Sequence, residues 1–144
     1  WLYPSPAMFT RAMERKGYAP PSHPELIVNL HNLVNEQCWQ EIRQWERLCG
    51  QHEPKLERFL GRPADLSPRA WFRHHLLGYC RPFDRHDWYV DRGDGQPPRR
   101  YVIDFYQGQA AESNVAQVAF HLDVRPALDS WQALRQRLFR LLGL

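Results

Sequence analysis

The sequence predicts an α+β fold in a single domain, with N-terminal helices followed by a small antiparallel β-sheet and a C-terminal helix. Two observations support this prediction. In the first half of the chain, apolar residues recur at helical spacing between Ser-Pro and Gly signals. In the second half, short runs of β-branched and aromatic residues flank a turn rich in Gly and Pro. The length of 144 residues suits one domain with its own core.

Two helices are predicted before residue 50. Ser5 can cap a short helix over about residues 6–16, which ends at Gly17. A proline-rich connector follows, and its stiff backbone separates the two helices. The second and longer helix is predicted from near Glu25 to Cys49.

The next stretch, residues 51–87, is predicted to be mostly loop with one helix inside it. Ser67 caps that helix, which starts at the following proline and ends at about Leu77. Gly78 then stops it. Residues 79–87 are interpreted as an ordered turn region.

The strands are predicted in the second half. Residues 88–91 and 100–106 form two strands joined by a wide hairpin turn over residues 93–98. A third strand is expected from Val115 to Val124.

A last helix is predicted to open at Pro126. Its apolar face contains Leu128, Trp131, Leu134, Leu138, Leu141 and Leu142. We expect this face to pack on the sheet while the arginines of the helix point into water. The alternative is that the helix lies on an anionic membrane surface.

Composition excludes few functions. The net charge of +3 is too small to indicate nucleic-acid binding, although it suits a ligand with carboxylates. Three scattered cysteines leave either free thiols or a single bridge. No apolar run is long enough to span a membrane. The many aromatic residues could fill a core or line a pocket for a flat ligand.

One histidine lies within the apolar stripe of the long helix. At about 100° per residue, a narrow sector contains His31, Asn35, Cys38, Ile42, Trp45 and Cys49. A histidine there is either a hydrogen-bonded core residue or a ligand that points into a cavity. The pattern alone favours a core residue, since partly buried histidines are common and one histidine makes no metal site.

Other reactive residues give weaker indications. Cys49 and His52 form one short pair with no second pair, which disfavours structural zinc. The segment Pro82–Trp88 places a histidine between carboxylates, so it could supply acid/base chemistry. Its spacing favours the alternative, a charged segment whose contacts hold a turn together.

Many short segments follow one another in the order found in a known family. The most distinctive are Pro82–Trp88, Arg100–Tyr106 and Leu122–Asp129. Trp1–Ser5 and Leu30–Asn32 belong to the same series. Together these segments extend from end to end of the chain and resemble the holocytochrome c synthases, also called cytochrome c haem lyases.

The resemblance implies a lyase that forms carbon–sulfur bonds between the two haem vinyl groups and the thiols of a Cys-x-x-Cys-His motif in apocytochrome c. It implies protohaem as a bound substrate, apocytochrome c as a partner and apocytochrome c1 as a further candidate. It also implies a location in the mitochondrial intermembrane space, peripheral on the inner membrane. No nucleic-acid partner is expected.

The resemblance also assigns residues. It makes His31 the catalytic residue and the axial ligand of the haem iron, with the substrate's own histidine on the other side of the iron. The residues it places at the haem site are Trp1, Tyr3, Met13, Asn32, Glu36, Arg85 and His86.

Four of these residues are less firmly placed at the haem site by the sequence. Arg85 and His86, together with Arg92, are weaker candidates, for the haem propionates or for the sheet edge. Asn32 and Glu36 lie away from the His31 sector, so either they support the site from another side or the helix breaks near Asn32.

Two other functions remain open on these residues. One is a non-catalytic haem-binding or delivery protein that uses the same His31. The other is an aromatic-rich binding module without haem. The Cys-Pro motifs that precede this region in the family are absent here. We therefore expect residues 1–144 to be a single haem lyase domain whose preceding N-terminal region is missing.

Overall fold

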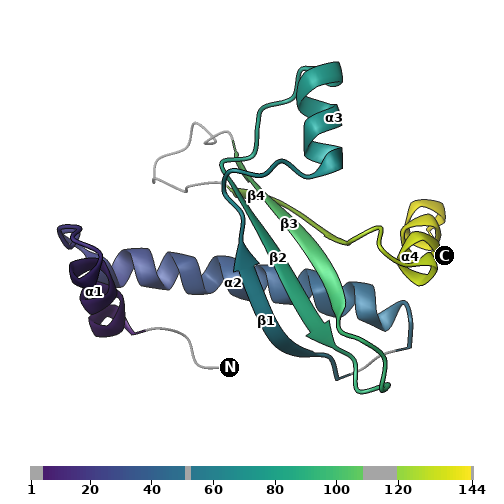
Figure 1. The fold of residues 1–144 in the computed structure, drawn as a ribbon, viewed down its shortest axis with the longest axis horizontal. Helices are drawn as coiled ribbons and strands as arrows, with labels where there is room; N and C mark the ends of the chain where they lie inside the picture. Colours follow the sequence, from purple (N-terminus) through teal and green to yellow (C-terminus); the bar gives the residue numbers. More distant parts are fainter. Residues whose placement is uncertain (1–4, 51–52, 109–119, 144) are drawn as a thin grey trace. The chain divides into compact units, whose positions relative to one another are not determined.

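The computed structural model describes residues 5–50, 53–108 and 120–143. Its elements, in order along the chain (Figure 1), are α1 (Pro6–Arg15), α2 (Pro24–Arg47), β1 (Lys55–Gly61), α3 (Pro68–Leu77), β2 (Asp84–Asp91), β3 (Arg99–Gln107), β4 (Phe120–Pro126) and α4 (Trp131–Leu142). This order confirms the α+β class. The chain divides into two compact units, Trp1–Gln40 and Glu41–Leu144, whose boundary falls inside α2. The single domain stays a prediction.

The Ser-Pro signals start two helices where the sequence predicts them. Ser5 accepts a hydrogen bond from the backbone N–H of Met8 at 3.3 Å, and Ser67 accepts one from that of Ala70 at 3.1 Å. Gly78 ends α3 in the left-handed conformation, with φ of 69°. A residue without a Cβ adopts that conformation without strain.

The sheet is antiparallel, with strand order β1-β2-β3-β4. The expectation that residues 51–87 are mostly loop was wrong, because β1 lies within them and pairs with β2. Strand β2 begins at Asp84 rather than at Trp88, so the segment interpreted as a turn is partly strand. Both errors have one cause, since these segments gain their extended form from pairing with each other.

The C-terminal part also begins later than predicted. Pro126 ends β4, and α4 starts only after Ser130, whose side chain caps it. The third predicted strand overlaps β4 over residues 120–124, whereas residues 115–119 lie outside the described part of the chain.

One face of the sheet carries the apolar core of the second unit. Trp88, Tyr101 and Ile103 are almost fully buried there. The C-terminal end of α2 packs on this face through two hydrogen bonds: Trp45 Nε1 donates to the carbonyl of Val124 at 2.9 Å, and the Tyr101 hydroxyl donates to Glu46 Oε1 at 2.6 Å. Burial and the nearby Glu46 carboxylate raise the pKa of Tyr101 above its ordinary value.

The other face of the sheet carries charged residues on all three C-terminal strands. Asp87 and Asp104 are completely buried, and Arg125 is nearly so. Arg125 Nη2 lies 2.5 Å from Asp104 Oδ2, which also accepts a hydrogen bond from the Ser67 hydroxyl at 2.6 Å. The cap of α3 is thereby tied to β3. Alternation of side chains along each strand separates this charged face from the apolar one.

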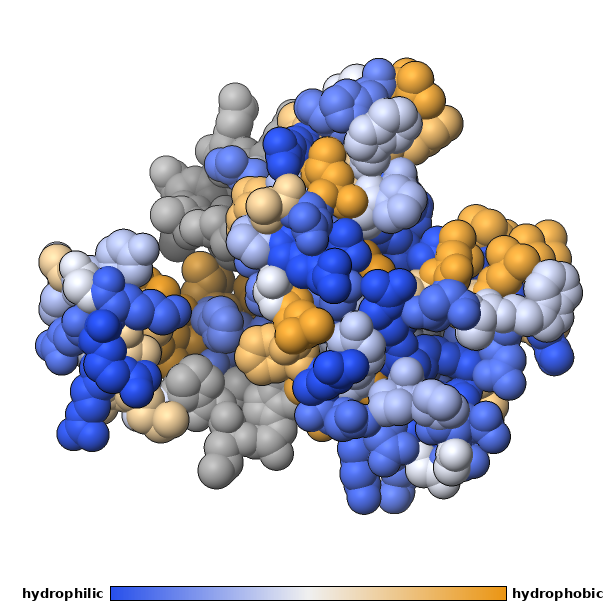
Figure 2. Space-filling view, in the orientation of Figure 1, coloured by the Kyte–Doolittle hydropathy of each residue, from blue (hydrophilic) through white to orange (hydrophobic). Residues whose placement is uncertain are grey.

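The expectation that α4 packs its leucine face on the sheet was wrong. Leu138, Leu141 and Leu142 are exposed, Leu141 to 82%. The buried residues of α4 are Ala133 and Gln136, and Gln136 Nε2 donates to the carbonyl of Trp45 at 3.1 Å. Figure 2 shows apolar residues gathered on the surface of α4. A small residue and an amide permit a closer approach of the helix than leucines would.

Two further findings concern the whole described part of the chain. None of its helices combines the length and apolar content needed to cross a membrane. All three cysteines are free thiols, with Cys38 buried and Cys49 and Cys80 exposed.

Candidate functional site

His31 lies on the surface of α2 and is not a core residue. The buried residues along this part of the helix are Val28, Asn35 and Cys38, whereas His31, in the same sector, is exposed. The alternative of a hydrogen-bonded core histidine, which the pattern favoured, was therefore wrong. An exposed imidazole on a regular helix can reach a ligand that approaches from outside the helix.

His31 has a partner one helical turn away. Its Nδ1 lies 3.1 Å from Nδ2 of Asn35, which is only 9% exposed. An amide can donate through nitrogen or, turned over, accept through oxygen, so Asn35 can serve either tautomer of the ring. The contact orients the imidazole and leaves Nε2 pointing away from Asn35. Asn35 was not among the residues predicted for the site, although the i, i+4 spacing on one face was a signal for it.

Asn32 and Glu36 lie on the neighbouring face of the same helix. The helix is continuous from Pro24 to Arg47, so it does not break near Asn32. The two residues line an open cleft of about 460 Å³ together with Asn29 and Leu33. The Oδ1 atom of Asn32 is buried and has no hydrogen-bond partner among the described residues. Glu36 accepts a hydrogen bond from Gln40 at 2.8 Å. A buried acceptor without a partner favours a donor from a ligand.

Three other residues of the expected site belong to the first 13 residues of the chain. Met13 is half-buried on α1. Trp1 and Tyr3 lie outside the described residues. Of the residues expected around His31, the described part thus brings together Asn32 and Glu36 and adds Asn35.

Arg85 and His86 point to opposite faces of β2. Arg85 is buried and directs Nε and Nη2 to Asp87 Oδ1 at 3.1 and 2.9 Å. These donors would have to leave Asp87 in order to bind a haem propionate. His86 is half-buried, with Nε2 at 3.1 Å from Asp84 Oδ2 and its ring edge-on to Phe105.

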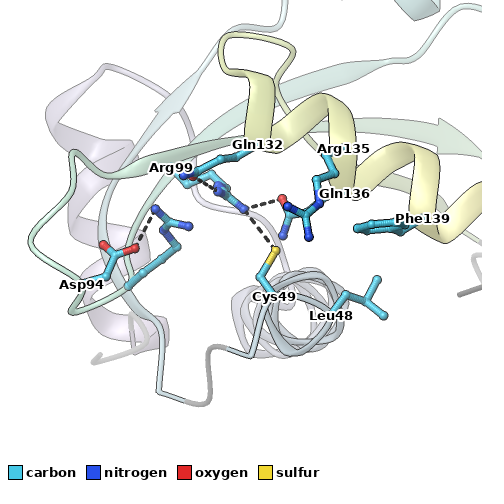
Figure 3. Close-up of a pocket in the computed structure, with 9 residues that line it drawn as sticks. Leu48, Cys49, Asp94, Arg99, Gln132, Arg135, Gln136 and Phe139 are labelled. Carbon is cyan, nitrogen blue, oxygen red and sulfur yellow. Dashed lines mark hydrogen bonds and ion pairs between the residues drawn. The ribbon is translucent and has the colours of Figure 1, made fainter.

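Arg92 lines a separate cleft of about 370 Å³ near the start of β3 and α4. Figure 3 shows this cleft with Asp94, Arg99 and Gln132 labelled. Its Nη2 is 2.7 Å from Asp94, whereas its Nε is buried without a hydrogen-bond partner among the described residues. Arg99 crosses the same cleft and donates to the amide oxygens of Gln132, at 2.9 Å, and Gln136. Arg92 thus has a carboxylate partner, whereas the partners of Arg99 are neutral amides that do not cancel its charge.

Metal ligands do not cluster in the described part of the chain. Among residues 5–50, 53–108 and 120–143, no three histidine, cysteine or acidic side chains come together as a metal site would require. Within Pro82–Trp88, Arg85 contacts Asp87 and His86 contacts Asp84, so the charged contacts of the alternative to acid/base chemistry are present. They lie on strand β2 and do not hold a turn, so that part of the alternative was wrong.

Comparison with known proteins gives a consistent result. Residues 1–52 and 49–141 match the family described as cytochrome c/c1 heme lyase. The chain is 43% identical to the holocytochrome-c synthase of Saccharomyces cerevisiae, over 99% of the chain and 61% of the relative. It is 43% identical to the holocytochrome c-type synthase of Homo sapiens, over 96% and 53% of the two lengths. It is 44% identical to a putative holocytochrome-c1 synthase of Chaetomium thermophilum, over 100% and 52%.

The chain spans about half the length of the curated relatives it matches. No solved structure matches it significantly. Because the family match covers nearly the whole of its length, the chain belongs to the cytochrome c/c1 heme lyase family.

Proposed function

We propose that this chain binds protohaem through His31 and that it forms the thioether bonds of cytochrome c as part of a holocytochrome c synthase. The family membership supports the reaction, a carbon–sulfur lyase acting on haem and apocytochrome c. The observation that carries the residue assignment is the exposed imidazole of His31, held by Asn35 within a segment that matches the family.

The chemistry of the site suits an axial ligand. A neutral imidazole coordinates haem iron through one nitrogen while the other nitrogen is held by a neighbouring group. Asn35 is in place to accept the Nδ1 proton of His31 when its amide oxygen faces the ring, and Nε2 is then the iron ligand. Asn32 and Glu36 offer polar contacts on the adjacent face.

The reaction requires positioning more than acid/base strength. Each cysteine S–H adds across a vinyl C=C bond, so that sulfur bonds to one carbon and the proton passes to the other. No oxidant is consumed in this addition. If His31 holds one face of the iron and the motif histidine of apocytochrome c binds the other, both thiols lie beside the two vinyl groups. Release of the product requires the bond between His31 and iron to be the weaker one.

The substrates and the location of the protein are also proposed from its membership of the family. We propose apocytochrome c as the substrate, with apocytochrome c1 as a second one, because relatives with both names match the chain. We place the protein in the mitochondrial intermembrane space, peripheral on the inner membrane. The exposed leucines and arginines of α4 support contact with an anionic membrane surface.

The test of haem binding is His31→Ala, with His23→Ala as the matched control. His23 lies in the same unit and its side chain is 70% exposed. We expect His31→Ala to abolish co-purified haem and its Soret band, whereas His23→Ala retains both. Asn35→Leu should lower haem affinity by about 10-fold to 100-fold without unfolding the chain. Full haem with an unchanged spectrum in His31→Ala would overturn the assignment.

A second experiment separates catalysis from haem delivery. The protein is incubated with reduced haem and apocytochrome c, and acid-stable haem on the cytochrome is then measured. A lyase yields covalent haem on the cytochrome, whereas a delivery protein yields only haem that acid extracts. Because the chain spans about half of its relatives, the experiment includes the longer protein beside this chain.

A further inference from the structure

A third cleft, unrelated to His31, lies along β4, the last strand of the described sheet. It has a volume of about 540 Å³ and lies wholly within the unit Glu41–Leu144. Helix α3 contributes Arg69 and Arg73, and α4 contributes Arg137 and Arg140. Figure 1 shows α3 and α4 as separate helices outside the sheet. The remaining residues that line the cleft are Glu41, Trp45, His121, Leu122, Asp123, Val124, Arg125 and Leu141.

Three of the arginines share a single carboxylate. Asp123 lies 3.3 Å from Arg69 Nη1, 3.5 Å from Arg73 Nη1 and 3.2 Å from Arg125 Nη1. Arg125 has a second carboxylate in Asp104. Arg69 and Arg73 have no other carboxylate among the described residues, and their side chains are 46% and 28% exposed. Most of their N–H donors are therefore available to a ligand.

The two arginines of α4 differ. Arg140 pairs with Glu41 at 3.0 Å and lies over the ring of Trp45. Arg137 donates to the carbonyl of Pro126, at 2.8 Å from Nε, and no described carboxylate lies within ion-pair distance of it. Burial together with the positive charges of Arg125 and Arg69 lowers the pKa of Arg137 to about 10.

The cleft thus carries an excess of positive charge. Five arginines line it, against the carboxylates of Asp123, Glu41 and Asp104. Guanidinium groups bind phosphate through paired N–H donors. We propose that this cleft binds a phosphate group, with Arg69, Arg73 and Arg137 as its ligands.

Two sources could supply the phosphate, a lipid headgroup or a soluble phosphate compound. Apolar side chains of Trp45, Leu122 and Leu141 line the cleft beside the arginines. The exposed Leu138 and Leu142 of α4 extend this apolar surface outside it. The inference does not depend on haem or on His31, so it can fail or succeed without affecting the proposed function.

The cleft shown in Figure 3 is the natural comparison, because it too is lined by arginines, three in this case. There Arg99 is almost fully buried and bonded to two glutamines, Arg92 is paired with Asp94, and Arg135 lies over the ring of Phe139. Arg135 belongs to the same helix as Arg137 but lines the other cleft. Arg135→Gln is therefore a matched control for Arg137→Gln.

The experiment measures the rise in thermal midpoint with inorganic phosphate, compared with potassium chloride at the same ionic strength. We expect phosphate to stabilise the wild-type chain and Arg135→Gln equally. Arg69→Gln and Arg137→Gln should each weaken phosphate affinity by about 10-fold or more, since each removes one charge-assisted contact. An equal response in all four proteins, or a loss in Arg135→Gln alone, would overturn the proposal.

An experiment with lipid vesicles then distinguishes a lipid headgroup from a soluble phosphate compound as the source of the phosphate. Wild-type chain and Arg69→Gln are sedimented with vesicles of phosphatidylcholine alone and with phosphatidylglycerol added. Sedimentation that requires phosphatidylglycerol and is lost in Arg69→Gln assigns the cleft to a lipid headgroup. Phosphate binding without sedimentation assigns it to a soluble phosphate compound.

Discussion

Two aspartates of the sheet each bind three arginines, yet the two clusters differ in charge balance. Asp87 lies 3.4 Å from Arg62, 2.9 Å from Arg85 and 3.2 Å from Arg100. Asp123 lies between 3.2 and 3.5 Å from Arg125, Arg69 and Arg73. The side chain of Asp87 is completely buried, whereas that of Asp123 is 11% exposed.

The two clusters differ in how many of their arginines also pair with a second carboxylate. In the Asp87 cluster, Arg62 also pairs with Asp65, and Arg100 also pairs with Asp129. In the Asp123 cluster, Arg125 alone has a second carboxylate among the described residues, and Arg137 adds further positive charge nearby. The Asp87 cluster therefore has matched charges within the fold, whereas the Asp123 cluster keeps surplus positive charge that the proposed phosphate would balance.

The largest effect is expected from Asp87→Asn. The change leaves Arg85 buried without its carboxylate, and breaking a buried pair in this way costs about 3–5 kcal/mol of unfolding free energy. Urea unfolding followed by circular dichroism measures the loss. If Asp87→Asn were no more destabilising than Asp123→Asn, the two clusters would not differ as described.

Glu46 is a third buried carboxylate, and it differs from the two aspartates because it accepts its hydrogen bond from the phenol of Tyr101. Tyr101→Phe removes the donor to Glu46 and leaves a buried acceptor unpaired, at a cost of about 1–3 kcal/mol.

The same pair predicts a pH dependence. Because the folded state raises the pKa of Tyr101, the unfolded state ionises first, so the unfolding free energy falls as the pH rises above about 10. Stability measured from pH 8 to pH 11 checks this. Tyr101→Phe should show a smaller decline than wild type, and an equal decline would contradict the prediction.

Asp123→Asn is expected to cost about 1–2 kcal/mol, less than Asp87→Asn, because Arg125 retains Asp104. The change also enlarges the surplus of positive charge in the cleft. Added phosphate should therefore recover more stability in Asp123→Asn than in wild type. A thermal shift titration compares the two, and a smaller recovery in the variant would count against the phosphate site.

The smallest effect is expected from Arg69→Gln in the absence of phosphate. Arg69 is nearly half exposed and makes one ion pair, so its loss should change the unfolding free energy by no more than about 0.5 kcal/mol. Arg100→Gln is the counterpart in the balanced cluster, and it should cost more because Arg100 joins two carboxylates. Equal costs would remove the distinction between the clusters.

Local signals predicted the helices well. Ser5, Ser67 and Gly78 fix helix ends through hydrogen bonds and backbone preferences that depend only on neighbouring residues. Strand β1 was missed because its side chains are mostly exposed and follow no alternating pattern. Its strand form depends on pairing with β2, which sequence periodicity does not report.

The C-terminal helix shows another limit of the sequence pattern. The leucine stripe of α4 predicted the buried face, but Ala133 and Gln136 occupy that position. The choice depends on how closely the helix approaches Trp45, which is a tertiary property.

The site was predictable only in part. His31 came from the family resemblance, and Asn35 could have been found from helical spacing. The arginine clusters could not, because they depend on strand register. Asp104 and Asp123 face each other across β3 and β4, although the residues between them give no sign of this pairing. Only the folded sheet brings their arginines together.

The irregular strand β1 has a consequence for self-association. It forms one border of the described sheet, and its register shifts between Leu56 and Arg58. Lys55, Glu57 and Arg58 place charges of both signs along this border. Pairing of a second molecule with this border is unfavourable, because the register shift twists the strand and the charged side chains would lose their hydration. This border should therefore disfavour fibril growth even at high protein concentration.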